Sequence, residues 1–193
     1  RFCVHLGAFV DDKRDFAHET HLKSVCESVS LIALDARLAA IRSAAGFFTG
    51  EPLTMPYYRD ARMSAAVAKA RAVGLSAEIA FSSSMAQYLK GKSNAPRLVD
   101  LCDADSAKWS EYAARKAWPM SAVYAREGRR LAQAESAIIN WADATFAVSE
   151  EEADLLGNRD EAQREVRWFC NGVDAVKFAP HAVEAGPRFT AVF

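Results

Sequence analysis

The chain has 193 residues, 51% of them hydrophobic, and its 24 lysines and arginines nearly balance its 25 aspartates and glutamates. This length predicts one domain with a sizeable core, and the balanced charge argues against a nucleic-acid partner. No apolar run approaches the roughly 20 residues of a membrane-spanning helix. The four cysteines lie far apart. They predict buried free thiols in a reducing cytoplasm rather than disulfides or a metal knuckle.

Short apolar runs alternate along the chain with longer segments of helical periodicity. Strands are predicted at 2–9, 29–34, 78–81, 97–102, 145–148 and 166–170, with a further run at 188–193. Helices are predicted at 14–27, 60–73, 84–90, 106–116, 121–143 and 150–156. The glycines and prolines of segment 46–58 indicate an aromatic loop or a broken helix. The alternation predicts an α/β fold with an open, mainly parallel sheet and helices on both faces.

Ligands of an open α/β sheet bind beyond the carboxyl ends of its strands, so polar residues directly after an apolar run are site candidates. After the strand at 78–81, Ser84 is expected either to bind a sugar hydroxyl or phosphate, or only to help cap the next helix. After the strand at 97–102, Asp105, Ser106 and Lys108 are candidates for binding an acceptor. In that interpretation Lys108 offsets the negative charge of a phosphate.

Asp103 and Asp105 also form a DxD triplet, which admits other interpretations. As hard oxygen ligands they would hold a divalent cation against a diphosphate, as in a metal-dependent nucleotide-sugar enzyme. Alternatively, one carboxylate caps the next helix and the other charges are solvated. A non-catalytic binding module is the remaining alternative, and it would lack a convergent polar cleft at the strand ends.

Three further places in the sequence carry polar residues of interest. Ser149 has the capping-box spacing to a glutamate three residues later, and Asn171 and Gly172 favour a tight turn with positive φ. On the long helix, Arg126 and Glu127 are second-rank site candidates, or else form surface pairs with Arg130. A group of basic residues forms either a solvated face or a contact with anionic lipid, and its members are Arg115, Lys116, Arg126, Arg129 and Arg130.

Several short motifs occur in a consistent order along nearly the whole chain. They are HLGAFVDD at 5–12, TGEPL at 49–53 with PYY at 56–58, SMAQY at 84–88, VD at 99–100 with DSAKW at 105–109, YAREGR at 124–129 with Leu131, and NGVD at 171–174 followed by F-x-P at 178–180. Together they resemble the N-terminal domain of GT-B glycosyltransferases. The resemblance is closest to the sugar transferases associated with the PEP-CTERM/exosortase system.

The resemblance implies two Rossmann-like domains that face a cleft. Residues 1–178 would be the acceptor-side domain, 179–187 the interdomain linker and 188–193 the start of the donor domain. The first strand and Gly-rich loop that such proteins have would be missing before residue 1, and most of the donor domain would be missing after residue 193.

The implied activity is transfer of a sugar from a nucleotide-sugar donor to a polyprenyl-linked or polysaccharide acceptor in exopolysaccharide synthesis. The enzyme is expected to retain anomeric configuration and to use no metal or other cofactor. Ser84, Asp105, Ser106 and Lys108 would line the acceptor side, Ser149 would lie near the donor phosphates, and Asn171 and Gly172 would form the interdomain hinge. No catalytic residue is assigned. The isolated chain is expected to be inactive, and the whole protein to lie in the cytoplasm or peripherally at the inner membrane face.

Overall fold

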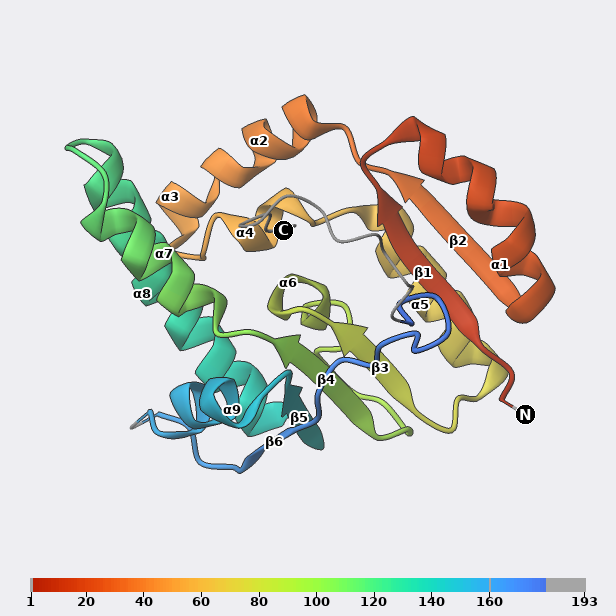
Figure 1. Ribbon diagram of the computed structural model, residues 1–193. Coiled ribbons are helices and arrows are strands. Elements are labelled where there is room, and N and C mark those ends of the chain that lie inside the picture. The colour runs from red at the N-terminus through yellow and green to blue at the C-terminus, as the bar shows by residue number, and fades with distance from the viewer. Residues whose placement is uncertain (1, 160, 180–193) are drawn as a thin grey trace, which may run out of the picture.

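The computed structural model describes residues 2–159 and 161–179, which form an α/β structure with parallel strands and flanking helices (Figure 1). The strands are β1 (His5–Val10), β2 (Ser28–Ala33), β3 (Glu78–Phe81), β4 (Arg97–Cys102), β5 (Ala144–Ala147) and β6 (Val166–Trp168). The predicted α/β class with parallel strands is confirmed. The predicted strand at 188–193 and all but the first residue of the predicted linker lie outside the described residues.

The helices follow the predicted order, with one addition and one division. They are η1 (Lys13–His18), α1 (Glu19–Val25), α2 (Ala36–Ala44), α3 (Gly46–Thr49), α4 (Thr54–Tyr57), α5 (Ala61–Val73), α6 (Ser83–Ala86), α7 (Asp105–Ala114), α8 (Met120–Trp141) and α9 (Glu150–Gly157). The first predicted helix is divided into the 3₁₀ helix η1 and α1. Segment 46–58 is a broken helix, because Gly50 at φ 77° separates α3 from α4.

The prediction of one open sheet is wrong for the described residues, which form two parallel sheets. One sheet pairs β1 with β2, and the other has the order β3-β4-β5-β6. In Figure 1, β1 rather than β2 lies next to β3, and all three strands run in the same direction. The single sheet is interrupted because the facing edges of β1 and β3 form no strand pair.

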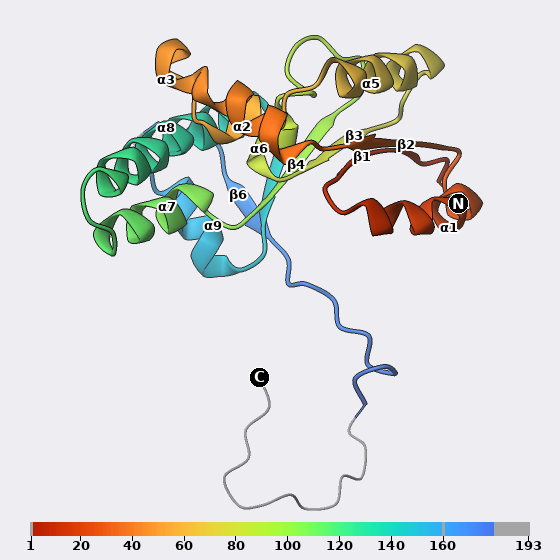
Figure 2. The same cartoon turned by 90° about the horizontal axis from the view of Figure 1, so that it is seen from above.

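Helix α5 connects the two sheets on one face. Its Met63 belongs to a hydrophobic cluster against which Phe9 of β1 packs, and its Arg71 forms a bidentate ion pair with Glu78 of β3, at 2.7 and 2.6 Å. Figure 2 shows α5 on one side of β1 and β2 and α1 on the other, so helices flank this sheet on both faces.

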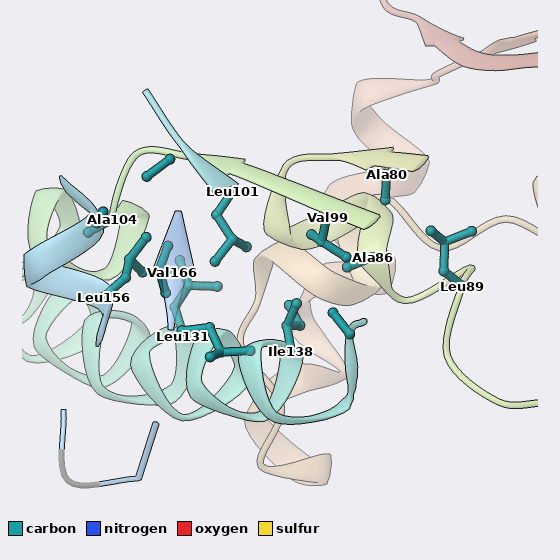
Figure 3. Close-up of a cluster of buried hydrophobic side chains, with 14 of the residues drawn as sticks. Ala80, Ala86, Leu89, Val99, Leu101, Ala104, Leu131, Ile138, Leu156 and Val166 are labelled. Carbon is teal, nitrogen blue, oxygen red and sulfur yellow. The ribbon is translucent and has the colours of Figure 1, made fainter. Parts of the chain in front are cut away.

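The main hydrophobic core lies between the four-stranded sheet and helices α8 and α9 (Figure 3). Val99 and Leu101 of β4 point toward Leu131 and Ile138 of α8, and Leu156 of α9 completes the layer. Alternate residues of a strand point to opposite faces. The residues on the other face of β3 therefore lie outside this core, and Ile79 and Phe81 are 71% and 68% exposed.

Helices α7 and α8 pack closely at Gly128. A Cβ atom at this position would lie 2.7 Å from Ser110 Oγ and 3.0 Å from the Ser106 carbonyl oxygen. We therefore expect Gly128→Ala to lower the free energy of unfolding by about 1–2 kcal/mol, although alanine is the better helix former. Urea denaturation would measure this change. The matched control is Gly157→Ala in α9, where the added Cβ atom would lie 3.9 Å from the Val166 side chain and where stability should be unchanged or increased. Equal effects of the two changes would contradict the packing explanation.

The prediction that the cysteines are buried is wrong for Cys3 and Cys170, which are exposed, whereas Cys26 and Cys102 are partly buried. The apolar runs that contain Cys3 and Cys170 extend past the ends of β1 and β6, so these thiols lie outside the paired strands. Within residues 2–159 and 161–179, no helix combines the length and the apolar character needed to cross a bilayer.

Candidate functional site

The carboxyl ends of β3 and β4 have an unusual backbone conformation. Cys102, the last residue of β4, has φ 62°, and Ser82, directly after β3, has φ 79°. Positive φ at residues other than glycine costs on the order of 1–3 kcal/mol and is concentrated at functional sites. The two strained residues are on neighbouring strands, because Ser82 N donates a hydrogen bond of 2.7 Å to the Asp100 carbonyl oxygen of β4. This strained backbone makes the carboxyl ends of β3 and β4 a candidate site.

Asp103, Asp105 and Lys108 come together just beyond β4. Lys108 Nζ lies 2.5 Å from Asp103 Oδ2 and 3.7 Å from Asp105 Oδ1. Burial raises the pKa of Asp105, and the charge of Asp103 raises it further, while the charge of Lys108 and the nearby Ser83 hydroxyl oppose the shift. The carboxyl of Asp105 is therefore more basic than an exposed aspartate. The ammonium of Lys108 keeps a raised pKa, mainly through its hydrogen bond to Asp103.

The serines of α6 are buried near the end of β3, and Ser83 lies near the Asp105 carboxyl group. Ser83 and Ser84 are buried, and Ser84 Oγ lies 3.0 Å from Ser82 Oγ. The buried Ser83 Oγ has no hydrogen-bond partner of good geometry among the described residues, yet Ser83 is close enough to Asp105 to lower the pKa of that carboxyl. Ser84 is thus buried and its hydroxyl is paired with that of Ser82. The Ser83 hydroxyl lies next to Asp105.

Ser106 points into the protein rather than toward Asp105. It is 4% exposed; its Oγ donates to Glu135 Oε2 at 2.6 Å and accepts from Arg159 Nη2 at 2.8 Å. The hydroxyl is thus engaged in a buried network between α7, α8 and the segment after α9. The structure does not bring Ser106 together with Asp105 and Lys108 in one open site.

Ser149 caps α9 at the end of β5. Its Oγ accepts a hydrogen bond of 3.3 Å from Glu152 N, as the capping-box spacing predicts. The carboxylate of Glu152 instead accepts a hydrogen bond of 2.6 Å from Ala104 N, beyond β4. Glu152 also contributes to the raised pKa of Lys108, so polar groups that follow β4 and β5 lie near one another.

Asp11 and Tyr58, which occur in the sequence motifs but are not among the predicted site residues, lie near the same region. Burial raises the pKa of the Tyr58 phenol, and the charges of Asp11 and Asp105 are among the groups that raise it further. Asp11 directly follows β1. It therefore meets the same criterion as Asp105, which is a polar residue soon after an apolar run. Tyr58 of the PYY motif does not follow a strand; it directly follows α4 and reaches this region only through the fold.

Arg126 and Glu127 anchor segment 46–58 to α8. Glu127 is 1% exposed and accepts hydrogen bonds from Leu53 N at 2.6 Å and from Thr54 N at 3.0 Å. Arg126 Nη2 donates to the Gly46 carbonyl oxygen at 2.5 Å. The alternative interpretation, a surface pair with Arg130, is wrong for Glu127, because its carboxylate is turned inward to these backbone groups.

Asn171 and Gly172 are exposed and lie outside any helix or strand. The predicted positive-φ turn is not formed there, since the glycines with positive φ in the described chain are Gly50, Gly74 and Gly91. The chain bends after Asp174 instead. The Asp174 side chain accepts hydrogen bonds from Val176 N and Lys177 N, so the turn forms after Asp174 and not at Asn171 and Gly172.

Two other features concern a thiol at the end of β4 and a pocket away from it. Burial raises the pKa of the Cys102 thiol to about 12, and nearby aspartates add to the shift, so this thiol stays protonated at neutral pH. A pocket of about 350 Å³ lies elsewhere, between α8 and the segments around Arg59 and Gln87, and contains none of the predicted site residues.

The chain has no match among protein-family models, curated proteins or solved structures. The likeness to GT-B glycosyltransferases therefore stays a prediction from the sequence motifs. The chemistry has to be inferred from the groups that converge at the strand ends, and we call Asp11, Tyr58, Ser83, Asp105 and Lys108 the strand-end cluster.

Proposed function

We propose that the strand-end cluster binds hydroxyl and phosphate groups of a sugar acceptor, and that the chain is the acceptor-side half of a glycosyltransferase. The observation that carries the proposal is the pairing of Asp105 with Lys108 at the carboxyl end of β4, next to two strained backbone positions. Ligands of open α/β sheets bind beyond the carboxyl ends of the strands. A carboxylate that accepts from a sugar hydroxyl beside an ammonium that neutralises phosphate suits a phosphate-linked carbohydrate.

The geometry favours the metal-free version of this proposal over the DxD alternative. The ammonium of Lys108 lies within hydrogen-bond reach of Asp103 and 3.7 Å from Asp105. A divalent cation held between these two carboxylates would have to displace this positive charge or be repelled by it. Lys108 thus supplies the charge that a metal would otherwise supply.

The rest of the proposed protein is what the resemblance to GT-B glycosyltransferases implies. A second domain would bind the nucleotide-sugar donor, with Ser149 near its phosphates and Asn171 and Gly172 at the hinge, and transfer would retain anomeric configuration. The acceptor would be polyprenyl-linked or a polysaccharide, which suits a cytoplasmic protein in peripheral contact with the inner membrane face. The isolated chain would bind acceptor without transferring sugar.

We expect Asp105→Ala and Lys108→Ala, made in the complete protein, each to lower kcat/KM for sugar transfer by roughly tenfold to a hundredfold. Each change removes one charge-assisted hydrogen bond. Thermal denaturation should move by less than about 2 °C, because both side chains are partly exposed. The matched control is Lys23→Ala, which breaks an exposed ion pair with Glu19 on α1 and should leave transfer unchanged.

Full transfer activity in both site variants would overturn the assignment of the strand-end cluster. Calorimetry with Mn²⁺ and a nucleoside diphosphate separates the metal-dependent alternative. Heat of binding that requires the metal and disappears in Asp105→Ala would replace the metal-free proposal with the DxD one.

A further inference from the structure

The pocket of about 350 Å³ contains no residue of the strand-end cluster, and we call it the α8 pocket. Its volume is within the range of about 300–1,000 Å³ that is usual for small-molecule sites. The apolar part of its lining consists of Pro52, Met55, Ala134, Ala137, Ile138 and Trp141. The last four are three or four residues apart on α8, so they lie on one face of this helix. The α8 pocket thus has an apolar floor, and the two alanines in it leave room for a ligand.

Hydrogen bonds hold the wall of the α8 pocket that faces this floor. Gln87 Nε2 donates to the Met55 carbonyl oxygen at 3.0 Å, which ties segment 46–58 to the residues after α6. Tyr88 Oη donates to the Tyr58 carbonyl oxygen at 2.5 Å. The same segment is anchored to α8 through the carboxylate described above. The pocket is therefore largely preformed, which is typical of ligand sites.

The polar part of the lining includes two cations with unused hydrogen-bond donors. Arg59 donates to Glu51 from Nη1 at 3.1 Å and from Nη2 at 2.9 Å, and its Nε donates to Gln87 Oε1 at 3.1 Å. A guanidinium group has five N–H donors, so two of those of Arg59 have no acceptor among the described residues. Lys90 is exposed, and no carboxylate of the described chain lies within 4.0 Å of its Nζ. Both side chains can therefore donate to a ligand.

The charged groups of the α8 pocket leave an excess of one positive charge. The hydrogen bond from Arg59 lowers the pKa of Glu51, and the charges of Arg59 and Lys90 lower it further, against the opposing effect of burial. Glu51 is therefore ionised at neutral pH and balances one of the two cations. A ligand with a single negative charge would balance the other, and its hydrogen bonds to these cations would be charge-assisted.

We infer that the α8 pocket binds a small carboxylate with an apolar body, such as an aromatic ring on a short hydrocarbon chain. The apolar body would lie against Ile138 and Trp141, and the carboxylate would accept from Lys90 and from the free N–H groups of Arg59. A phosphate monoester carries about 1.5–2 negative charges at neutral pH, which exceeds the one positive charge that the pocket leaves unbalanced. The inference rests on this pocket alone and does not depend on the proposed sugar transfer.

The test is titration of the 193-residue chain with phenylbutyrate, followed by NMR of the alanine methyl groups. The methyl signals of Ala134 and Ala137 should shift saturably, with a Kd of about 1 mM or lower. Phenylbutyramide has the same apolar body without the charge and should bind at least about fivefold more weakly. Inorganic phosphate at the same ionic strength should leave both signals unchanged, because it has no apolar body to bury.

Ala137→Leu should weaken the binding of phenylbutyrate at least about tenfold, because the larger side chain fills the pocket. Ala137 is exposed, so the fold should tolerate this change, and circular dichroism checks that it does. The Ala134 methyl signal reports binding in this variant. The matched control is Ala122→Leu, at an exposed position of the same helix outside the pocket, where the Kd should change by less than about twofold.

Lys90→Met should weaken the binding of phenylbutyrate by about threefold to tenfold, because it removes the cation but keeps an unbranched side chain. Lys92→Met removes the same charge from an exposed position outside the pocket and should change the Kd by less than about twofold.

Four results would each overturn the inference. They are shifts that stay linear up to about 10 mM phenylbutyrate, equal binding of phenylbutyramide, an unchanged Kd in Ala137→Leu or Lys90→Met, and inorganic phosphate that binds as tightly as phenylbutyrate. The last result would indicate an anion site that does not use the apolar floor.

Discussion

Replacing Arg159 by methionine is expected to lower the free energy of unfolding by about 3–5 kcal/mol. Arg159 Nη1 lies 2.6 Å from Glu135 Oε2, and the Glu135 side chain is only 1% exposed. The methionine would fill much of the same volume but would leave the carboxylate buried without its cation. Urea denaturation followed by circular dichroism at pH 7 measures the loss.

The same variant should show a distinctive pH dependence. Burial raises the pKa of Glu135, while hydrogen bonds from Ser106 and Arg159 lower it. Removing Arg159 takes away one opposing interaction, so the pKa of Glu135 in the folded protein rises further. The folded state then holds a proton that the unfolded state loses near 4.5, so stability falls as pH rises between these two pKa values. The loss caused by Arg159→Met should thus be larger at pH 8 than at pH 5.

The double variant Arg159→Met with Glu135→Gln provides the control. The glutamine carries no charge to be left unpaired, and it can still hydrogen-bond to Ser106. We expect the double variant to recover at least about 1 kcal/mol relative to Arg159→Met at pH 8. A loss that is independent of pH and is not relieved by Glu135→Gln would show that Arg159 stabilises the fold through packing alone.

Glu127→Ala is expected to lower the free energy of unfolding by about 2–4 kcal/mol. The carboxylate accepts from Leu53 N, Thr54 N and Thr54 Oγ1, and hydrogen bonds to charged groups contribute about 1.5–3 kcal/mol each without being additive. Its removal would also release segment 46–58 from α8. We therefore expect limited proteolysis to cut within this segment at least about tenfold faster, which denaturant titration and mass spectrometry together would record.

The control for Glu127→Ala is Glu111→Ala on α7. Glu111 is well exposed and lies 3.5 Å from Arg115, so its removal should change stability by less than about 0.5 kcal/mol. Similar losses in the two variants, or an unchanged cleavage rate in segment 46–58, would contradict the anchoring role of Glu127.

The sequence predicted those parts of the fold that local pattern determines. The bounds of β3 and β4 agree with prediction, because breakers and polar residues flank short apolar runs. Helix α2 was missed, since it buries only Ala39 and has no apolar stripe; it begins where Asp35 caps Arg37 N and Leu38 N. The division into two sheets depends on which strands pair, and strand pairing leaves no trace in hydrophobic periodicity.

The candidate site was predictable only in part. Position after a strand selected Asp105 and Lys108, which lie together, but it also selected Ser106, whose hydroxyl is turned toward Glu135 and Arg159. These partners are 29 and 53 residues away in the chain. The orientation of the first turn of α7 thus depends on long-range contacts that no local motif encodes.

The pattern of strand pairing also bears on how the chain folds. Within the described residues, each parallel pair joins strands that are consecutive in the chain, and no pair links β1 or β2 to the strands after α5. The entropy of loop closure grows with the length of the loop, and local contacts favour fast folding. We therefore expect the strand pairs of each half to form early in folding, and the ion pair between Arg71 and Glu78 to form in a later step, when the halves dock.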